Sequence, residues 1–411
     1  MPEWISWLAL FVFLYPGAMA VYWTVFGTFY YFFWERGRPE PKFRAKDAPK
    51  VSVLVPCYNE AANLRKSVPF LVTLNYPNYE LVLINDGSRD NTRRVINELA
   101  AQHPHKIRAI HQPNGGKASA LNNALQKIDS EYVVCIDGDA VLDRKAVDYM
   151  MQTLLSDPMI GGVTGNPRVR NRSTILGQMQ VAEFSSIIGL IKRAQCILGT
   201  VFTVSGVICG FRRSVLLQVG GWSTNMITED IDISWKVQLA GYNIAYEPRA
   251  LCWVLMPESF RGLFKQRLRW AQGGAEVIMK YARYVWRWDY RRLWPLYAEY
   301  MVTAFWAYSL IAILVAKIVF YDTPMITWNN ADDFLPAQSA LLFLFFLVQF
   351  MLSVWIDSRY EKGVGRYFVN SVWYPYVFWA MSVATLVMGI PKALLRDRKR
   401  QATWVSPDRG V

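Results

Sequence analysis

In EYVVCIDGDAVLD, residues 131–143, an apolar run of strand-forming residues ends in two aspartates, Asp137 and Asp139. Side chains two positions apart in an extended chain point to the same side, so both carboxylates face one way. In an open α/β sheet, ligands bind at the carboxyl ends of the strands. Two carboxylates there suit a hard divalent cation that takes its other ligands from water and phosphate. A D-x-D pair also occurs in solvated turns, and the rest of the chain distinguishes the two interpretations.

Short β-rich runs alternate with stretches of helix length around this segment. The strands are expected at residues 51–55, 81–84, 107–111 and 132–136, and the intervening helices include residues 60–73 and 91–102. Strands that alternate with helices at this spacing predict βαβ units and a mainly parallel sheet. We therefore expect an α/β domain over residues 50–257.

The composition indicates a membrane protein. Of its 411 residues, 53% are hydrophobic and 15% aromatic, with 17 Trp and a formal net charge of +13. A basic excess fits nucleic acid, an anionic membrane face or an anionic substrate. No run of like charges resembles a nucleic-acid-binding arm, so we expect membrane lipid and a phosphate-bearing substrate as partners, and no nucleic acid. The five cysteines form no C-x-x-C pair, which indicates thiols in a reducing compartment.

Apolar runs long enough to cross a bilayer occur at both ends of the chain. They lie at residues 4–34, 300–320, 334–356 and 367–390. Only Lys317 is charged within the last three. The linker that follows the first run is basic and rich in proline, which places that side of the membrane in the cytoplasm by the positive-inside rule.

The order of these segments gives the domain organisation. Residues 286–297 mix tryptophan with arginine, as an interfacial helix does. Three late spans would leave the basic residues 392–400 outside, so either the run broken by Pro375 is re-entrant or the tail departs from the rule. We divide the chain into an N-terminal transmembrane helix (1–34), a basic linker (35–49), the α/β domain (50–257), interfacial helices (258–298), two to three spans (299–394) and a basic tail (395–411).

Further candidate residues follow or begin other predicted elements. Asp86 ends the second strand in a D-G-S turn, a pattern that turn chemistry and a helix cap also explain. Lys117 follows a glycine pair at the start of a helix-like segment, where phosphate can bind, although the P-loop spacing is absent. Asp230 ends the T-E-D that opens an amphipathic helix. Ordinary N-capping explains such acids, and the functional alternative is a general base for an acceptor hydroxyl.

The segment QRLRW at residues 266–270 completes the set. In a helix, Gln266, Arg269 and Trp270 share one face. The arginine fork holds a pyrophosphate well, and tryptophan offers an apolar face to a sugar ring. An interfacial membrane helix is the alternative explanation.

Together and in this order, these motifs resemble the processive membrane glycosyltransferases of family 2, which include cellulose, chitin and hyaluronan synthases. The matching elements are Asp86, the D-x-D at Asp137 and Asp139, the T-E-D ending in Asp230 and Q-x-x-R-W at residues 266–270. The likeness is greatest to the bacterial poly-β-1,6-N-acetylglucosamine synthases of the PgaC type, through segments such as VCIDGDA, TVSGVI, MITEDIDISWK and KQRLRWAQGGAEV. It covers nearly the whole chain.

The resemblance implies a GT-A fold embedded between membrane helices, with UDP-N-acetylglucosamine as the donor. Asp86 and Asp137 would contact the uridine and ribose side, and Asp139 would ligate Mg²⁺ or Mn²⁺ on the diphosphate. The metal and Arg269 would neutralise the departing UDP. Asp230 would take the proton from the 6-hydroxyl of the acceptor sugar. Attack opposite the leaving group would then invert an α-linked donor to a β-linked product.

The same resemblance implies the acceptor side and the partners. Trp270 would stack on the acceptor sugar with Gln266 nearby, Lys117 would contact the donor phosphate, and Asn166 and Arg168 would face the sugar. The late spans would line the exit path of the growing polysaccharide in the inner membrane. A small two-span PgaD-like subunit and stimulation by cyclic di-GMP are also implied. The sequence holds no R-x-x-x-R with D-x-S-x-x-G to bind that nucleotide.

Two alternatives stay open. Another family 2 synthase, making chitin-like oligomers or hyaluronan, would carry the same motifs, because the acceptor linkage depends on pocket shape. A transporter or membrane scaffold could use the α/β part as a nucleotide sensor. Intramembrane carboxylates would favour that alternative, and the three predicted late spans contain none.

Overall fold

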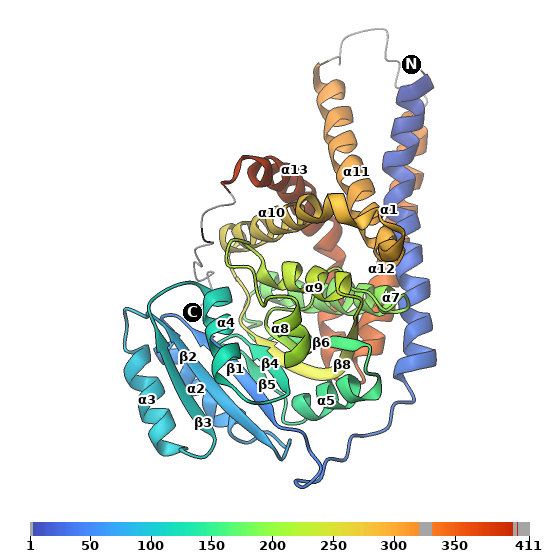
Figure 1. Cartoon of the computed structure of the whole chain (residues 1–411). Coiled ribbons are helices and arrows are strands. Elements are labelled where there is room, and N and C mark those ends of the chain that lie inside the picture. The colour runs from blue at the N-terminus through green and yellow to red at the C-terminus, as the bar shows by residue number, and fades with distance from the viewer. Residues whose placement is uncertain (1–2, 320–330, 398–400, 402–411) are drawn as a thin grey trace.

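A mixed eight-stranded sheet lies at the centre of the molecule, and long apolar helices extend away from it (Figure 1). The computed structural model describes residues 3–319, 331–397 and 401. The strands are β1 (Val51–Cys57), β2 (Tyr79–Asp86), β3 (Ile107–Gln112), β4 (Tyr132–Ile136), β5 (Val141–Leu142), β6 (Ile160–Val169), β7 (Ile208–Arg212) and β8 (Asn243–Val254). The helices beside the sheet are α2 (Ala61–Leu71), α3 (Thr92–Gln102), α4 (Lys117–Lys127), α5 (Ala146–Ser156), α6 (Ile175–Glu183), η2 (Phe184–Leu190), α7 (Ile191–Cys196), α8 (Arg213–Gln218) and α9 (Glu229–Leu239).

The sheet combines a parallel half with a mixed half. The strand order is β3-β2-β1-β4-β7-β6-β8-β5. β1 is parallel to β2 and β4, and β2 is parallel to β3, whereas β7 runs antiparallel to both β4 and β6. The four predicted strands correspond to β1–β4, so the mainly parallel α/β sheet is confirmed. Because β1, β2 and β4 are parallel, their carboxyl ends meet at one edge of the sheet.

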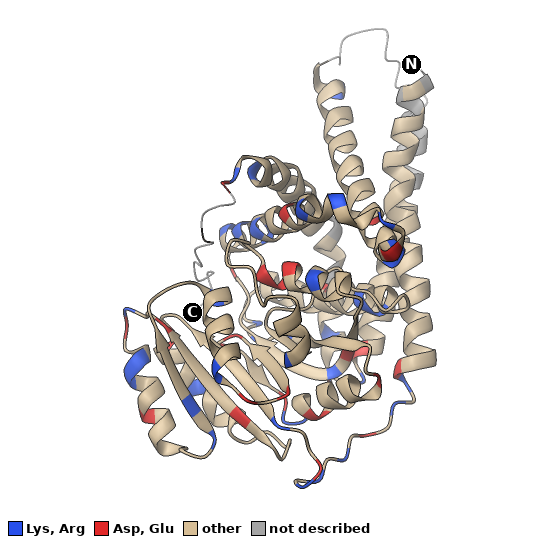
Figure 2. Cartoon of the chain, in the orientation of Figure 1, with Lys and Arg blue, Asp and Glu red and all other residues tan. Residues whose placement is uncertain are grey.

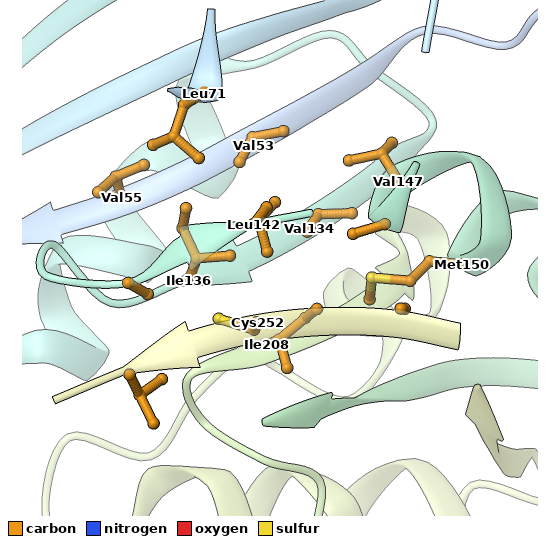
Figure 3. Close-up of a cluster of buried hydrophobic side chains, with 14 of the residues drawn as sticks. Val53, Val55, Leu71, Val134, Ile136, Leu142, Val147, Met150, Ile208 and Cys252 are labelled. Atoms are coloured by element: carbon orange, nitrogen blue, oxygen red, sulfur yellow. The ribbon is translucent and has the colours of Figure 1, made fainter. Parts of the chain in front are cut away.

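The central strands are buried on both faces, which explains why their sequences are continuous apolar runs. Val53 and Val55 of β1 point into the cluster that includes Leu71 of α2 and Met150 of α5 (Figure 3). Between them, Leu54 points to the opposite face and packs with residues of α4. Both faces of the sheet are therefore fixed by packing, and β1 and β4 hold the candidate site residues rigidly at their ends.

Within the described residues, four helices are long and apolar enough to cross a membrane. These candidate spans are Trp7–Glu35, Trp288–Val319, Ser339–Asp357 and Val377–Leu395. They are built from α1 (Glu3–Tyr30) with η1 (Tyr31–Glu35), η3 (Trp288–Leu293) with α11 (Trp294–Val319), α12 (Ala331–Asp357), and η5 (Pro375–Trp379) with α13 (Ala380–Leu395). Figure 2 shows almost no charge along α1 and α11, whereas Lys, Arg, Asp and Glu are spread through the sheet-bearing part.

The last apolar run differs from the single span expected at residues 367–390. Its first part is the separate helical segment η4 (Val364–Trp373), and the candidate span begins later, at Val377. Pro375 stands at the start of η5, the position in a helix where a missing N–H costs least. The second span also begins earlier than the expected residue 300, because η3 leads directly into α11. Most of the predicted basic tail, residues 395–411, lies outside the described residues.

Buried ion pairs tie the spans to the sheet. Arg193 of α7 donates to Glu35 at 2.6 Å and to Asp357, at the end of α12, at 2.9 Å. Arg168 of β6 lies 2.7 Å from the other oxygen of Asp357 and 3.6 Å from Glu361. All five side chains are buried. Because removing one partner leaves a buried charge uncompensated, this network fixes the ends of η1 and α12 against the sheet.

A long amphipathic helix, α10 (Phe260–Val285), lies between the spans and the sheet-bearing part. Figure 1 shows it running across the direction of α1 and α11, above α9. It carries the predicted Q-x-x-R-W segment, so that segment is helical as expected. One face of α10 packs on α9 and the other on α13.

Candidate active site

The carboxyl ends of β1, β2 and β4 surround a cleft with about 410 Å³ of open space. Three of the predicted residues, Asp86, Lys117 and Asp137, line it. The full lining is Pro56, Cys57, Tyr58, Glu60, Asp86, Asn114, Lys117, Asp137 and Gly138. The cleft therefore lies at the strand ends, where the topology of an α/β sheet directs ligands.

Asp86, at the end of β2, organises one wall of the cleft. Its carboxylate accepts hydrogen bonds from the backbone N–H of Gly115 at 2.9 Å and of Gly116 at 2.8 Å, and from the Gln112 amide at 2.7 Å. Gly116 has φ 85°, in the left-handed region that favours glycine. Asp86 thus holds the glycine turn that starts α4 against the cleft, and this turn places Lys117.

Lys117 is the cation at the centre of the site. Its Nζ donates to Asp137 Oδ1 at 2.6 Å and to the Gly206 carbonyl at 3.1 Å, and it lies 3.2 Å from Glu229 Oε1. Burial opposes its charge, but the nearby carboxylates of Asp137, Glu229 and Asp230 outweigh burial and raise the pKa of Lys117 well above its usual range. Lys117 is therefore charged, and it joins β4, the loop before β7 and the start of α9.

The two aspartates of the D-x-D segment lie together beside β8. Asp137 is partly exposed and accepts from Lys117, whereas Asp139 is 8% exposed. Burial, and then the charges of Asp137 and Asp139, raise the pKa of the Cys252 thiol well above its usual range, so both carboxylates lie close to that sulfur. No group of three or more His, Cys, Asp or Glu side chains with metal-binding geometry occurs among the residues that the structure describes. A cation at this site would depend on ligand oxygens as well as on the protein.

Asp230 lies in the first turn of α9 and faces the same region. A Cβ placed on Gly206 would lie 3.0 Å from Asp230 Oδ2, so the carboxylate rests on that glycine. Burial, and then the neighbouring Glu229, raise the pKa of Asp230 from 3.8 to about 6, against the opposing charges of Lys117 and Arg269. A carboxyl group with a pKa near 6 accepts a proton more readily at neutral pH than an ordinary aspartate does.

The helix α10 closes the site from the side of the spans. A Cβ on Gly273 would collide with Thr228 Oγ1, so glycine is needed for α10 to pack on the T-E-D segment. Arg269 is close enough that its charge lowers the pKa of Asp230. Two residues before Arg269, the Arg267 guanidinium lies 4.3 Å from the centre of the Trp270 ring. The packing therefore brings the T-E-D and Q-x-x-R-W motifs together.

Comparisons with known proteins agree with this geometry. A family model described as "Glycosyltransferase like family 2" matches residues 49–273. A poly-beta-1,6-N-acetyl-D-glucosamine synthase of Staphylococcus epidermidis is 41% identical over 408 residues, covering 97% of this chain and 98% of the relative. A protein of the same name from Staphylococcus aureus (strain COL) is 39% identical over 407 residues, with the same coverage of both chains. The chain belongs to the poly-β-1,6-N-acetyl-D-glucosamine synthase family. It is thus a membrane-associated family 2 glycosyltransferase, as the motifs predicted.

A solved structure is similar in fold. The mannosyltransferase PcManGT from Pyrobaculum calidifontis, in complex with GDP-Man and Mn²⁺, superposes with a TM-score of 0.64. It is 22% identical and covers 92% of this chain and 99% of its own. The predicted GT-A fold flanked by membrane helices is confirmed.

Seven of the ten predicted site residues are not part of the cleft lining, and three of these seven lie in packed surroundings. Asn166 is fully buried on β6, and its amide donates to the Pro248 carbonyl at 2.9 Å. Arg168 belongs to the buried ion-pair network described above. Gln266 is 8% exposed, and its Oε1 has no hydrogen-bond partner. The contacts of Asn166 and Arg168 give them structural roles, and the acceptor roles of all three stay predictions.

Sequence reasoning missed several residues that the structure places at the site. Glu60 lines the cleft and packs against Gly138, where an added Cβ would lie 3.2 Å from Glu60 Cγ. Glu229 pairs with Lys117, and Gly206 supports Asp230. The P-C-Y-N-E sequence at the end of the first strand was the available signal for Glu60. Gly206 gave none, because its role depends on a contact with α9.

Proposed function

We propose that this family 2 glycosyltransferase polymerises N-acetylglucosamine from UDP-N-acetylglucosamine into β-1,6-linked poly-N-acetylglucosamine, an exopolysaccharide of biofilms. The proposal rests on the assembled site, in which the Asp230 carboxyl, with its pKa raised to about 6, stands beside Lys117, Arg269 and the D-x-D cleft. The names of the relatives support the sugar and the linkage of the polymer, and the UDP-linked donor follows from the family resemblance.

Charge supports a divalent cation, Mg²⁺ or Mn²⁺, as cofactor. The site region holds six carboxylates against the cations Lys117, Arg269 and Lys192, an excess of negative charge before an anionic donor arrives. The carboxylates are Glu60, Asp86, Asp137, Asp139, Glu229 and Asp230. A metal held by one or two carboxylates plus phosphate oxygens is the usual arrangement for such cations, and Asp139 is the residue we assign to it. When bound, the cation would offset the diphosphate charge and stabilise departing UDP.

The residues of this chain would divide the reaction between them. Asp86 and Asp137 would hold the nucleoside side of the donor, and Lys117 would contact the phosphates. The acceptor sugar would stack on Trp270, which lies one helical position after Arg269. Asp230 would remove the proton of the acceptor 6-hydroxyl as that oxygen attacks the anomeric carbon. The bond to UDP would break on the opposite side, and Arg269 would stabilise the charge on UDP.

We place the catalytic domain on the cytoplasmic side of the bacterial inner membrane. The basic linker after the first span supports this orientation. The proposed donor is a nucleotide sugar, a class of metabolite that occurs in the cytoplasm. The candidate spans would conduct the growing polysaccharide outward. A small PgaD-like membrane subunit and stimulation by cyclic di-GMP stay predictions from family resemblance.

Product analysis tests the linkage. Membranes containing the protein would be supplied with radiolabelled UDP-N-acetylglucosamine and Mg²⁺, and the polymer then treated with a β-1,6-specific hydrolase. We expect complete digestion. A polymer that resists this enzyme but is degraded by chitinase or hyaluronidase would establish the alternative family 2 activity and refute our proposal. Asp230→Asn membranes, which should produce no polymer, provide the background.

A further inference from the structure

A buried lysine outside the predicted motifs lies beside the loop that supports Asp230. Lys192, on the short helix α7, is 6% exposed. Its Nζ donates to Ser205 Oγ at 2.6 Å and to Thr164 Oγ1 at 3.1 Å. The Ser205 backbone N–H also donates to Thr164 Oγ1, at 2.8 Å. The ammonium group thus closes a polar cluster, and it forms no ion pair with a carboxylate of the residues that the structure describes.

This cluster fixes the loop on which Asp230 rests. Ser205 precedes Gly206, whose Cα faces Asp230 Oδ2 and whose carbonyl accepts from Lys117. One residue before Ser205, the backbone N–H of Val204 donates to Ser234 Oγ at 2.8 Å. Ser234 in turn donates to the Asp230 carbonyl at 2.6 Å. The loop at residues 204–206 is therefore bonded to α9 on one side and to Lys192 on the other.

Resting on the proposed function, we propose that Lys192 is a positioning residue for glycosyl transfer. Its buried ammonium holds Ser205 and Gly206 in place against Asp230, and its positive charge favours the ionised form of that carboxylate. A neutral side chain of similar size would leave the loop without its anchor and Asp230 without this charge. Burying a cation without a carboxylate partner costs folding free energy. The position of Lys192 beside the proposed base gives a functional reason for that cost.

The electrostatic surroundings support this role. Burial lowers the pKa of Lys192 to about 8, while Cys196, Asp230 and Cys209 act in the opposite direction. These three are the titratable groups that face the ammonium, from α7 itself, from α9 and from β7. Because the interaction is mutual, the Lys192 charge lowers the affinity of Asp230 for a proton. Lys192 is charged at neutral pH and loses its proton as the pH rises through about 8.

The test compares the pH profile of the initial polymerisation rate in four variants and the wild type. For Lys192→Met we expect kcat to fall roughly 10- to 100-fold, while the KM for the donor changes less than about threefold. The low-pH side of its rate profile (the acid limb) should shift to higher pH by roughly half a unit to one unit, because a positive charge near Asp230 is lost. Lys192→Arg retains the charge, so its acid limb should stay at the wild-type position, and its rate should persist above pH 8.

Two further variants separate anchoring from charge. Ser205→Ala removes the hydrogen-bond acceptor but leaves the ammonium, so kcat should fall without a shift of the acid limb. Lys236→Met is the matched control, because Lys236 also lies in the α9 region but donates to the Gly221 carbonyl. It should leave kcat and the acid limb unchanged. UDP binding and thermal unfolding confirm that each variant is folded.

The proposal is overturned if Lys192→Met retains the wild-type kcat, or if kcat falls while the acid limb stays in place. The second result would mean that Lys192 serves the fold alone. A wild-type protein that uses a different UDP-sugar would refute the proposed function only, since the same pH profiles can then be measured with that sugar.

Discussion

Replacing Asp230 by asparagine should abolish polymer synthesis and, at the same time, stabilise the protein. Burial, and then Glu229, raise the pKa of Asp230 from 3.8 to about 6. The folded state therefore holds this proton more tightly than the unfolded state. Stability contributed by the protonated carboxyl is fully present below pH 3.8 and is lost as the pH rises through about 6. Above that pH the ionised carboxylate is a net cost to folding.

The magnitude follows from the shift. At about 1.36 kcal/mol per pKa unit, the cost is about 3 kcal/mol at pH 7.5 and roughly half as much at pH 5. Asparagine carries no charge to bury, so Asp230→Asn should be more stable than the wild type by up to these amounts. The assay is thermal or denaturant unfolding of the detergent-solubilised protein at both pH values, with UDP binding measured in parallel. UDP binding should be retained.

A second aspartate on the same helix provides the control. Asp232 is fully buried, and it accepts from Lys280 Nζ at 2.5 Å and from the Tyr281 hydroxyl at 2.9 Å. Asp232→Asn removes a buried carboxylate that accepts from the partly exposed Lys280 and from Tyr281, and it should destabilise by about 1–3 kcal/mol. The reasoning is refuted if Asp230→Asn is less stable than the wild type at pH 7.5, or if it still makes polymer.

Three other substitutions test the packing around the site and the spans. Asp357→Asn leaves Arg193 and Arg168 without a shared carboxylate and should lower the free energy of unfolding by about 3–5 kcal/mol. The control, Asp289→Asn at an exposed position, should change it by less than about 0.5 kcal/mol. Equal effects of the two substitutions would contradict the role given to the network. Gly273→Ala should push the T-E-D segment away from Arg269 and lower kcat roughly 10- to 100-fold. Gly274→Ala, whose Cβ would lie 3.4 Å from Tyr300, should be tolerated, and equal activity of the two would contradict the close approach. Lys117→Met should weaken UDP binding in calorimetry roughly 10- to 100-fold by removing a charged hydrogen-bond donor, and unchanged affinity would exclude Lys117 as a phosphate contact.

Local patterns predicted the parallel half of the sheet well. The runs that form β1, β2 and β4 are largely apolar because both of their faces are buried, and glycine or polar turns mark their ends. The edge strand β3 is partly exposed and mixes apolar with polar residues. Asp86 and Asp137 could be placed at the cleft for this reason alone. The T-E-D and Q-x-x-R-W motifs could be placed on helices from their spacing.

Contacts between distant segments could not be predicted in this way. Arg168 was assigned to the sugar from the family resemblance alone, yet its partner Asp357 lies at the end of a late apolar helix. Lys192 looks like an ordinary surface residue in a helix, since its partners Ser205 and Thr164 come from other elements. The break at Pro375 was visible in the sequence, whereas the start of the candidate span at Val377 was not, because the run is apolar on both sides of the proline.

The central claim is that carboxylates at the strand ends hold a cation-bridged nucleotide sugar. The most direct test measures metal-dependent UDP binding by the full-length wild type and by Asp139→Asn. Calorimetry of the wild type should show UDP binding with Mn²⁺ that EDTA abolishes, and Asp139→Asn should lose this metal-dependent part while remaining folded. Equal UDP binding by both proteins, with and without EDTA, would contradict the account.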